Sequence, residues 1–283
     1  MARSVSRPAT HFPFGENWAR FAENIDESRI AEAARALRRL LGDTLRGARF
    51  LDVGCGSGIH AVAALRLGVK CVSAIDLDPR SVATTRNTLT THAPSGPWDV
   101  SVASALDLDP DKLGRYDVVY SWGVLHHTGR MWDAVRCAAS MVDDGGSLAI
   151  ALYRKTALCA AWRAEKRLYN ALPRSQPLLR TAYIGWLRAA LALRGETFST
   201  YVDEYRLRRG MDFYRDVHDW LGGWPYESAR PEEVHSFLGE LGFALDREYA
   251  RPGGLGLLGS GNDEYVFRRV IDSRGDTNRP IAR

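Results

Sequence analysis

Between residues 50 and 153, short apolar runs alternate with segments of helical periodicity, and this alternation constrains the fold most strongly. The runs have the length and the Val, Ile and Leu content of buried strands: 50–53, 71–76, 100–103, 116–121 and 147–153. Helical segments at 59–67, 80–91 and 132–141 separate them. Apolar strands that alternate with helices indicate a parallel sheet covered on both faces. We therefore predict an open, doubly wound α/β architecture.

The rest of the chain adds further parts to this framework. An amphipathic helix is expected at 23–41, before the first strand, and a long non-alternating, mostly helical insertion follows the fifth strand. A helix at 231–241 and two strands at 243–250 and 262–270 then complete a mostly parallel, seven-stranded sheet. The expected parts are an N-terminal lid and helix (1–44, with 1–11 a loose tail), the α/β core (45–153), the helical insertion as an acceptor lid (154–222), the end of the core (223–270) and a disordered tail (271–283).

Composition excludes several classes of protein. Of the 283 residues, 45% are hydrophobic and 25% are charged, which is ordinary for a globular protein and excludes general disorder. No apolar run is long enough to span a membrane, and the first residues do not resemble a signal peptide. The net charge of +4 is too small to indicate a nucleic-acid partner. Four scattered cysteines without a CxxC pair are expected to be reduced thiols of a cytoplasmic protein. Whether the chain forms a homo-oligomer stays open.

A glycine-rich turn, LDVGCGSG at residues 51–58, lies between the first strand and the first helix. Glycines let the backbone approach a ligand closely, and a helix start offers unpaired N–H groups that suit a carboxylate or a phosphate. Asp76 ends the second strand, 18 positions beyond Gly58. An acid at this place can accept hydrogen bonds from both hydroxyls of a ribose. The sequence therefore predicts a cradle for a nucleoside that carries a negatively charged group.

Four motifs follow one another in a familiar order: LDVGCGSG, AIDLDP, SALDLD and YDVVYSWGVLHH. In this order and spacing they resemble the class I S-adenosylmethionine-dependent methyltransferases, across about residues 45–153 and 231–270. The resemblance implies an enzyme with S-adenosylmethionine as its cofactor. It implies these cofactor contacts: Gly54, Gly56 and Gly58 on the methionine and ribose; Asp52 near the ammonium group; Asp76 on the ribose hydroxyls; Leu77 on adenine; Ser104 and the Ala105 amide at the adenine amino group, where many members carry Asp; Ser121 and Trp122 beside the methionine and the reactive methyl.

The residues after the fourth strand bear on what is methylated. Enzymes of this class that methylate nucleic-acid amino groups usually carry a Pro-Pro turn there, whereas this chain reads SWGV at 121–124. The GVLHH pattern is similar to methyltransferases that act on natural products, sugars and quinones. The resemblance thus implies methyl transfer to an oxygen or nitrogen of a small-molecule acceptor in a biosynthetic pathway. Two alternatives stay open: an RNA or protein methyltransferase, and a non-catalytic protein that binds the cofactor.

His126 and His127 follow the fourth strand, where an acceptor would lie. A hydroxyl or ammonium acceptor must lose a proton, and imidazole suits that role near neutral pH. We predict that one of the pair, His127 rather than His126, is the base. The alternative is that one histidine only packs against the sheet and orients the loop. His60 and His92 are expected at the surface or behind the site.

The acceptor site is expected to be covered by the N-terminal segment and the insertion. Asn17 and Trp18 are the candidates before the core, and Tyr214, His218 and Asp219 are those within the insertion, where a solvated helix surface is the alternative. Residues 154–209 carry twelve Lys or Arg against four acids, a net charge of +8. This charge indicates either solvated helix faces or an acidic or phosphate-bearing acceptor, with a membrane surface third. A metal site would need clustered carboxylates near the methyl, and the sequence has no such cluster, so no metal is expected.

Overall fold

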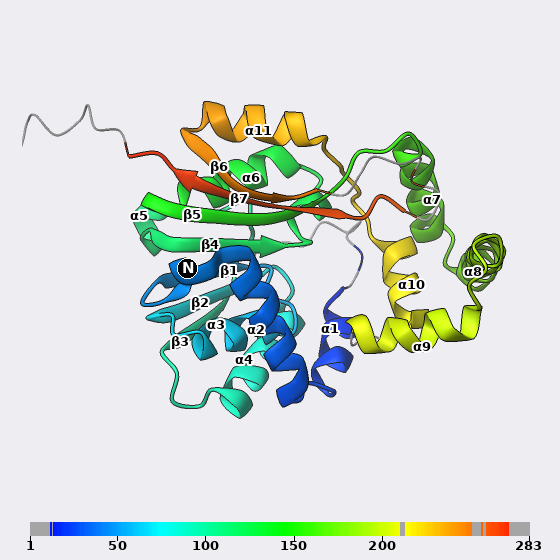
Figure 1. Cartoon of the computed structure of the whole chain (residues 1–283), viewed down its shortest axis with the longest axis horizontal. Coiled ribbons are helices and arrows are strands. Elements are labelled where there is room, and N and C mark those ends of the chain that lie inside the picture. The colour runs from blue at the N-terminus through cyan, green and yellow to red at the C-terminus, as the bar shows by residue number, and fades with distance from the viewer. Residues whose placement is uncertain (1–11, 13, 210–212, 251–255, 257–258, 272–283) are drawn as a thin grey trace, which may run out of the picture.

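The computed structural model describes residues 12, 14–209, 213–250, 256 and 259–271 (Figure 1). Its centre is a seven-stranded sheet in the order β3-β2-β1-β4-β5-β7-β6. The strands are β1 (Arg49–Val53), β2 (Cys71–Asp76), β3 (Trp98–Val102), β4 (Tyr116–Trp122), β5 (Val142–Tyr153), β6 (Phe243–Tyr249) and β7 (Asn262–Arg269). The first five strands are parallel, and β7 runs antiparallel to both β5 and β6. The predicted doubly wound, mostly parallel sheet is confirmed.

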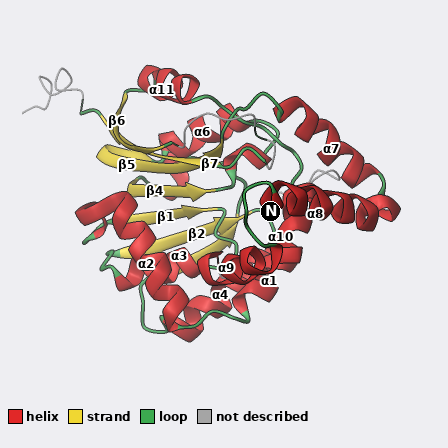
Figure 2. Cartoon of the chain, turned by 45° about the vertical axis from the view of Figure 1, so that its right-hand side comes forward, coloured by secondary structure: helices red, strands yellow, loops and turns green. Residues whose placement is uncertain are grey.

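Helices cover both faces of the sheet (Figure 2). One face packs on α2 (Glu27–Leu41), α3 (Ile59–Arg66) and α4 (Pro79–His92), and the other on α6 (Met131–Ser140) and α11 (Pro231–Glu240), with the short α5 (Pro110–Leu113) beside β4. Successive side chains of a strand point to opposite faces. Phe50 accordingly joins the core under α2, whereas Leu51 joins the core under α6. Burial on both faces explains why these strands read as continuous apolar runs.

Capping residues fix where the helices begin. The helix expected at 23–41 starts at Glu27, because the Asp26 carboxylate accepts a hydrogen bond from the Arg29 N–H at 2.9 Å. Asp78 caps α4 in the same way, with Pro79 in its first turn. Before Asp26 the chain forms a separate helix, α1 (Phe14–Ala22).

The strand expected at 147–153 is longer than predicted. β5 begins at Val142 and includes Gly145 and Gly146. Only Gly145 has a positive φ, 71°, and the strand continues through it. Residues 1–11, those from 272 onward and most of the glycine-rich loop at 253–261 lie outside the described residues. Within the described ranges, no helix is long and apolar enough to cross a membrane.

The insertion after β5 is helical and stands at the carboxyl ends of the parallel strands (Figure 1). It comprises α7 (Cys159–Ala171), α8 (Gln176–Ala192), α9 (Phe198–Arg209) and α10 (Phe213–Gly222). Tyr169, Leu187 and Leu221 belong to a small apolar core of its own. The N-terminal segment joins it to the sheet domain, because the Phe12 N–H donates to the Trp224 carbonyl at 3.1 Å while α1 packs against both α4 and α10.

A buried ion pair ties the end of β5 to β7. The Arg154 Nε lies 2.7 Å from an Asp263 carboxylate oxygen, and the two side chains are 8% and 2% exposed. Arg154→Met should lower the free energy of unfolding by about 3–5 kcal/mol, because it leaves the buried Asp263 charge without its guanidinium. Urea denaturation measures this, with Lys112→Met at the exposed pair with Asp109 as control, where little change in the free energy of unfolding is expected. Equal losses in both variants would contradict the assignment.

Candidate active site

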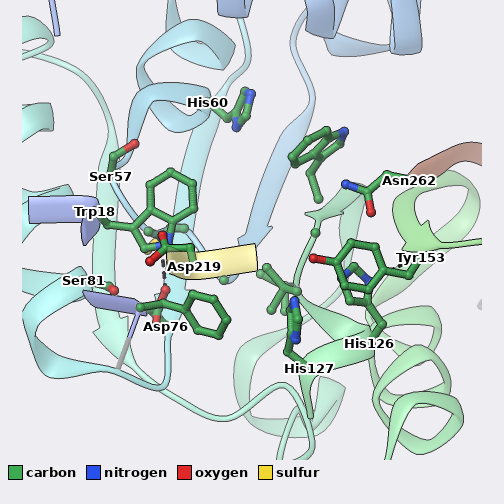
Figure 3. Close-up of a pocket in the computed structure, with 18 of the residues that line it drawn as sticks. Trp18, Ser57, His60, Asp76, Ser81, His126, His127, Tyr153, Asp219 and Asn262 are labelled. Atoms are coloured by element: carbon green, nitrogen blue, oxygen red, sulfur yellow. Dashed lines mark hydrogen bonds between the residues drawn. The ribbon is translucent and has the colours of Figure 1, made fainter. Parts of the chain in front are cut away.

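A cleft of about 2100 Å³ opens between the carboxyl edge of the sheet, α1 and the insertion. The glycine-rich turn, the ends of β2, β4 and β5, and one face of α10 all contribute to its lining. In Figure 3, Trp18, Asp76 and Asp219 lie on one side of the cleft and His127, Tyr153 and Asn262 on the other. The fold therefore brings the nucleoside cradle and the candidate base into one space.

Two glycines of the turn cannot carry a side chain in this backbone. Gly54 has φ 81°, and a Cβ there would lie 2.4 Å from a methyl carbon of Val124. Gly56 has φ 54°, and a Cβ there would lie 3.1 Å from the Trp18 ring. Both glycines line the cleft, whereas Gly58 caps α3 just behind it. The turn thus exposes bare backbone to the cleft under the indole of Trp18.

Asp76 is held in place at the end of β2 by backbone groups. One carboxylate oxygen accepts the Gly56 N–H at 3.1 Å, and the other accepts the Asp78 N–H at 2.8 Å. These hydrogen bonds connect the acid directly to the glycine turn. Asp76 lines the cleft together with Leu77, Ser104 and Ala105, and the Ser104 hydroxyl oxygen accepts the Leu106 N–H at 3.1 Å.

Asp52 is buried behind the turn, 3% exposed, and does not itself line the cleft. Its Oδ2 has no hydrogen-bond partner among the described residues. Burial, together with the nearby Asp76 charge, raises the pKa of Asp52 to about 7. A buried carboxylate oxygen without a partner is stabilised by an added cation, so this position fits the ammonium group of an amino-acid moiety.

The last two residues of β4 differ in position, one buried in the sheet and the other at the cleft. Ser121 is fully buried, donates to the Val53 carbonyl at 2.9 Å and does not line the cleft. Trp122 does line it, with its Nε1–H donating to Glu264 at 2.9 Å. Of the two residues predicted beside the methyl group, the structure places only Trp122 in the cleft.

His127 lines the cleft, and its orientation is fixed on one side of the ring. Its Nδ1 lies 2.7 Å from the Pro225 carbonyl oxygen, which can only accept, so Nδ1 carries a proton. In the neutral ring, Nε2 is then the nitrogen with a lone pair. The Phe14 ring packs at 5.1 Å from the imidazole. This arrangement is what a general base requires.

His126 also reaches the cleft but has the opposite tautomer. Its Nδ1 accepts the Tyr153 N–H at 3.3 Å, which leaves the proton on Nε2. The side chain is fully buried, and Nε2 has no partner among the described residues. Burial first, and then the neighbouring His127 and Lys166, hold the pKa of His126 well below its usual range. His126 is therefore a neutral hydrogen-bond donor rather than a base.

The predicted acceptor residues divide into two groups. Trp18 and Asp219 line the cleft, and Asn17 donates a hydrogen bond to Asp219 from α1 without lining it. Tyr214 and His218 do not line it. The Tyr214 side chain is 48% exposed, which agrees with the alternative of a solvated helix surface. His218 instead bonds the Tyr169 hydroxyl at 2.5 Å inside the insertion.

A family model described as a methyltransferase domain matches residues 25–240, most of the chain. The chain belongs to this family. It is a class I S-adenosylmethionine-dependent methyltransferase domain, as the sequence motifs predicted.

The curated relatives match over part of the methyltransferase. A ubiquinone biosynthesis O-methyltransferase of Xanthomonas campestris is 38% identical over 112 residues, 40% of this chain and 46% of the relative. The corresponding enzyme of Xanthomonas oryzae is 33% identical over 153 residues, 52% of this chain and 63% of the relative. The matches thus span less than two thirds of these relatives.

Solved structures share the fold at low identity. Magnesium protoporphyrin IX methyltransferase from Synechocystis, with bound S-adenosylhomocysteine, superposes with a TM-score of 0.51 at 15% identity and covers 94% of this chain and 91% of that one. The N-methyltransferase NodS from Bradyrhizobium japonicum gives 0.51 at 15% identity, over 91% and 99% of the two chains. These likenesses support the fold of the methyltransferase alone.

Several residues of the cleft were missed by sequence reasoning. Tyr153, Asn262 and Trp220 line it, but they come from three distant elements that no short motif connects. His60 was expected at the surface or behind the site, yet it lines the cleft from the first turn of α3, where burial lowers its pKa to about 4. A histidine directly after the glycine turn was the available signal. Within the described ranges of the methyltransferase, no group of three acidic, His or Cys residues could hold a metal.

Proposed function

We propose that this chain transfers a methyl group from S-adenosylmethionine to an oxygen or nitrogen of a small-molecule acceptor bound in the cleft. The observation that carries the proposal is the position of His127. Its Nδ1 proton is held by the Pro225 carbonyl, and it shares the cleft with the glycine turn and Asp76. An acceptor between these two sides would lie next to both a methyl donor and a base.

The residues of the cradle fit the cofactor. Asp76, oriented by two backbone N–H groups, is placed to accept from the ribose hydroxyls, and the Asp52 oxygen without a partner suits the methionine ammonium. Leu77, Ser104 and Ala105 would border the adenine. When bound, S-adenosylmethionine supplies a methyl group activated by a positively charged sulfur. The chain's residues then have to align the acceptor and exclude water.

His127 would handle the proton. Its Nε2 lone pair takes the proton from the acceptor's hydroxyl or ammonium group as the acceptor atom bonds to the methyl carbon. In that displacement, bound S-adenosylmethionine would supply the methyl carbon and would keep the electron pair of the carbon–sulfur bond on its sulfur. The Pro225 carbonyl stabilises the imidazolium that forms, because it keeps the Nδ1 proton hydrogen-bonded.

The positive charge of the insertion does not by itself indicate a negatively charged acceptor. Of its Lys and Arg residues with described side chains, Arg194 alone lines the cleft, while Arg163, Arg167 and Arg188 are exposed and Lys166 is buried. The +8 charge thus agrees with solvated helix faces for the residues whose side chains are described. An acidic or phosphate-bearing acceptor stays a prediction from the sequence.

Asp76→Ala tests the cofactor part of the proposal. We expect weaker binding of S-adenosylhomocysteine by about 1.5–3 kcal/mol, the usual range for hydrogen bonds to a charged group, measured by calorimetry. Asp99→Ala is the matched control, because Asp99 is an exposed acid on the neighbouring β3. Unchanged affinity in Asp76→Ala, or equal losses in both variants, would contradict the assignment of Asp76 to the ribose.

A further inference from the structure

One acid of the insertion faces the cleft, and no described cationic side chain pairs with it. Asp219 lies on α10 beside Trp18, held by a hydrogen bond from the Asn17 side chain. Among the described residues it forms no ion pair, and burial together with the nearby Asp216 raises its pKa to about 7. A desolvated carboxylate in this situation is stabilised by any cation that enters the cleft. The same charge disfavours an anion.

Aromatic rings also line the cleft. Trp18 and Phe14 come from α1, and Trp220 follows Asp219 on α10. Deeper in the insertion, Tyr201 and Tyr205 line the cleft, with rings 6.0 and 5.4 Å from Phe213. Ring faces attract an organic cation, most strongly where water is excluded. A carboxylate beside the Trp18 ring, in a cleft with further aromatic walls, therefore favours an ammonium group over a neutral or negatively charged one.

A second, independent feature of the cleft also points to a ligand. The His126 Nε2–H is buried, lines the cleft and has no partner among the described residues. A buried donor of this kind costs free energy until it finds an acceptor atom. An N–H donor pairs with an acceptor lone pair, so this place suits a hydroxyl or carbonyl oxygen. The cleft thus offers one place for a cationic group of a ligand and another for a hydroxyl or carbonyl oxygen.

We propose that the acceptor binds as a protonated amine, with its ammonium group on Asp219 and an oxygen of the same molecule on His126. This inference rests on the proposed function and names its substrate class. It differs from the acidic acceptor that the charge of the insertion suggested, because Asp219 lines the cleft, whereas most of the insertion's described arginines do not.

Calorimetry on the full chain saturated with S-adenosylhomocysteine tests the proposal with three probes of similar size: 2-phenylethylamine, 2-phenylethanol and 3-phenylpropionate. The amine should bind at least about tenfold more tightly than the alcohol, as expected for a charge-assisted hydrogen bond. The propionate should bind most weakly. Asp219→Asn should remove the preference for the amine. Asp144→Asn, at an exposed acid of β5 outside the cleft, should keep it.

The outcomes separate this inference from the proposed function. Equal binding of amine and alcohol by the wild type, no binding of either, or a preference that survives Asp219→Asn would overturn the amine subsite. Tighter binding of the propionate would overturn it in favour of an acidic acceptor. Loss of S-adenosylhomocysteine binding by the wild type would instead refute the cofactor cradle, and the first titration of each experiment measures that affinity by itself.

Discussion

His127→Ala should lower kcat by about 10²–10⁴, the usual contribution of general acid–base catalysis. The substitution removes the Nε2 lone pair that would take the acceptor's proton, while the cradle around Asp76 and the glycine turn stays intact. Affinity for S-adenosylhomocysteine should therefore change little. The wild-type rate should rise with pH through an apparent pKa that the variant lacks, because only the neutral imidazole can accept a proton. The steady-state rate of S-adenosylhomocysteine formation, with an acceptor that the wild type methylates, measures both the loss in kcat and the pH dependence.

The matched control is His92→Ala, at a histidine in the last turn of α4 that does not line the cleft. It should retain wild-type turnover. A loss of less than about tenfold in His127→Ala would mean that the enzyme works by alignment alone. A loss of cofactor affinity in that variant would place His127 in the methionine pocket and contradict the catalytic assignment.

Deleting residues 1–21 should reduce turnover by more than about 10²-fold while the α/β core remains folded, since aligning groups and excluding water contribute that much or more. The described part of this segment supplies Trp18 above Gly56 and Phe14 against His127. It also bonds to Asp219 through Asn17. Without it, one wall of the cleft is missing and water reaches the reacting atoms. Turnover and circular dichroism of the truncated chain measure the two halves of the prediction.

Tyr214→Ala, at an exposed side chain that does not line the cleft, is the control and should retain turnover. If the truncated chain unfolds, Phe14→Ala gives the same information, since it removes only the ring beside His127. Full activity in the truncated chain would show that the segment is a mere tail. Full activity in Phe14→Ala would likewise contradict its place in the active site.

The sheet and the cofactor cradle could be predicted because their residues are close in sequence. Gly54 and Gly56 sit in one turn, where positive φ and the nearby Val124 and Trp18 require glycine. Asp76 ends the next strand and bonds back to that turn. Local backbone constraints of this kind leave motifs, so the alternation of strands and helices and the closeness of Asp76 to the glycine turn follow from a single stretch of the chain.

The acceptor side could be predicted only in part, because tertiary packing decides which face of a helix is used. Tyr214 and His218 lie four residues apart on α10, but Tyr214 is exposed and His218 bonds Tyr169 in the insertion. Asp219 and Trp220 point to the cleft instead. Both faces carry aromatic and polar side chains, so periodicity did not distinguish them. The +8 charge was similarly uninformative, since a sum does not say which arginines are exposed.

Methyl transfer itself tests the central claim most directly. Purified wild-type chain, His127→Ala and Asp76→Ala would each be incubated with S-adenosylmethionine and a panel of hydroxylated amines, amines and alcohols, with products detected by mass spectrometry. The account predicts that the wild type forms a methylated hydroxylated amine in equal amount to S-adenosylhomocysteine, and that both variants form far less. Product formation by His127→Ala at the wild-type rate, or cofactor binding by the wild type without methylation of any compound in the panel, would contradict it.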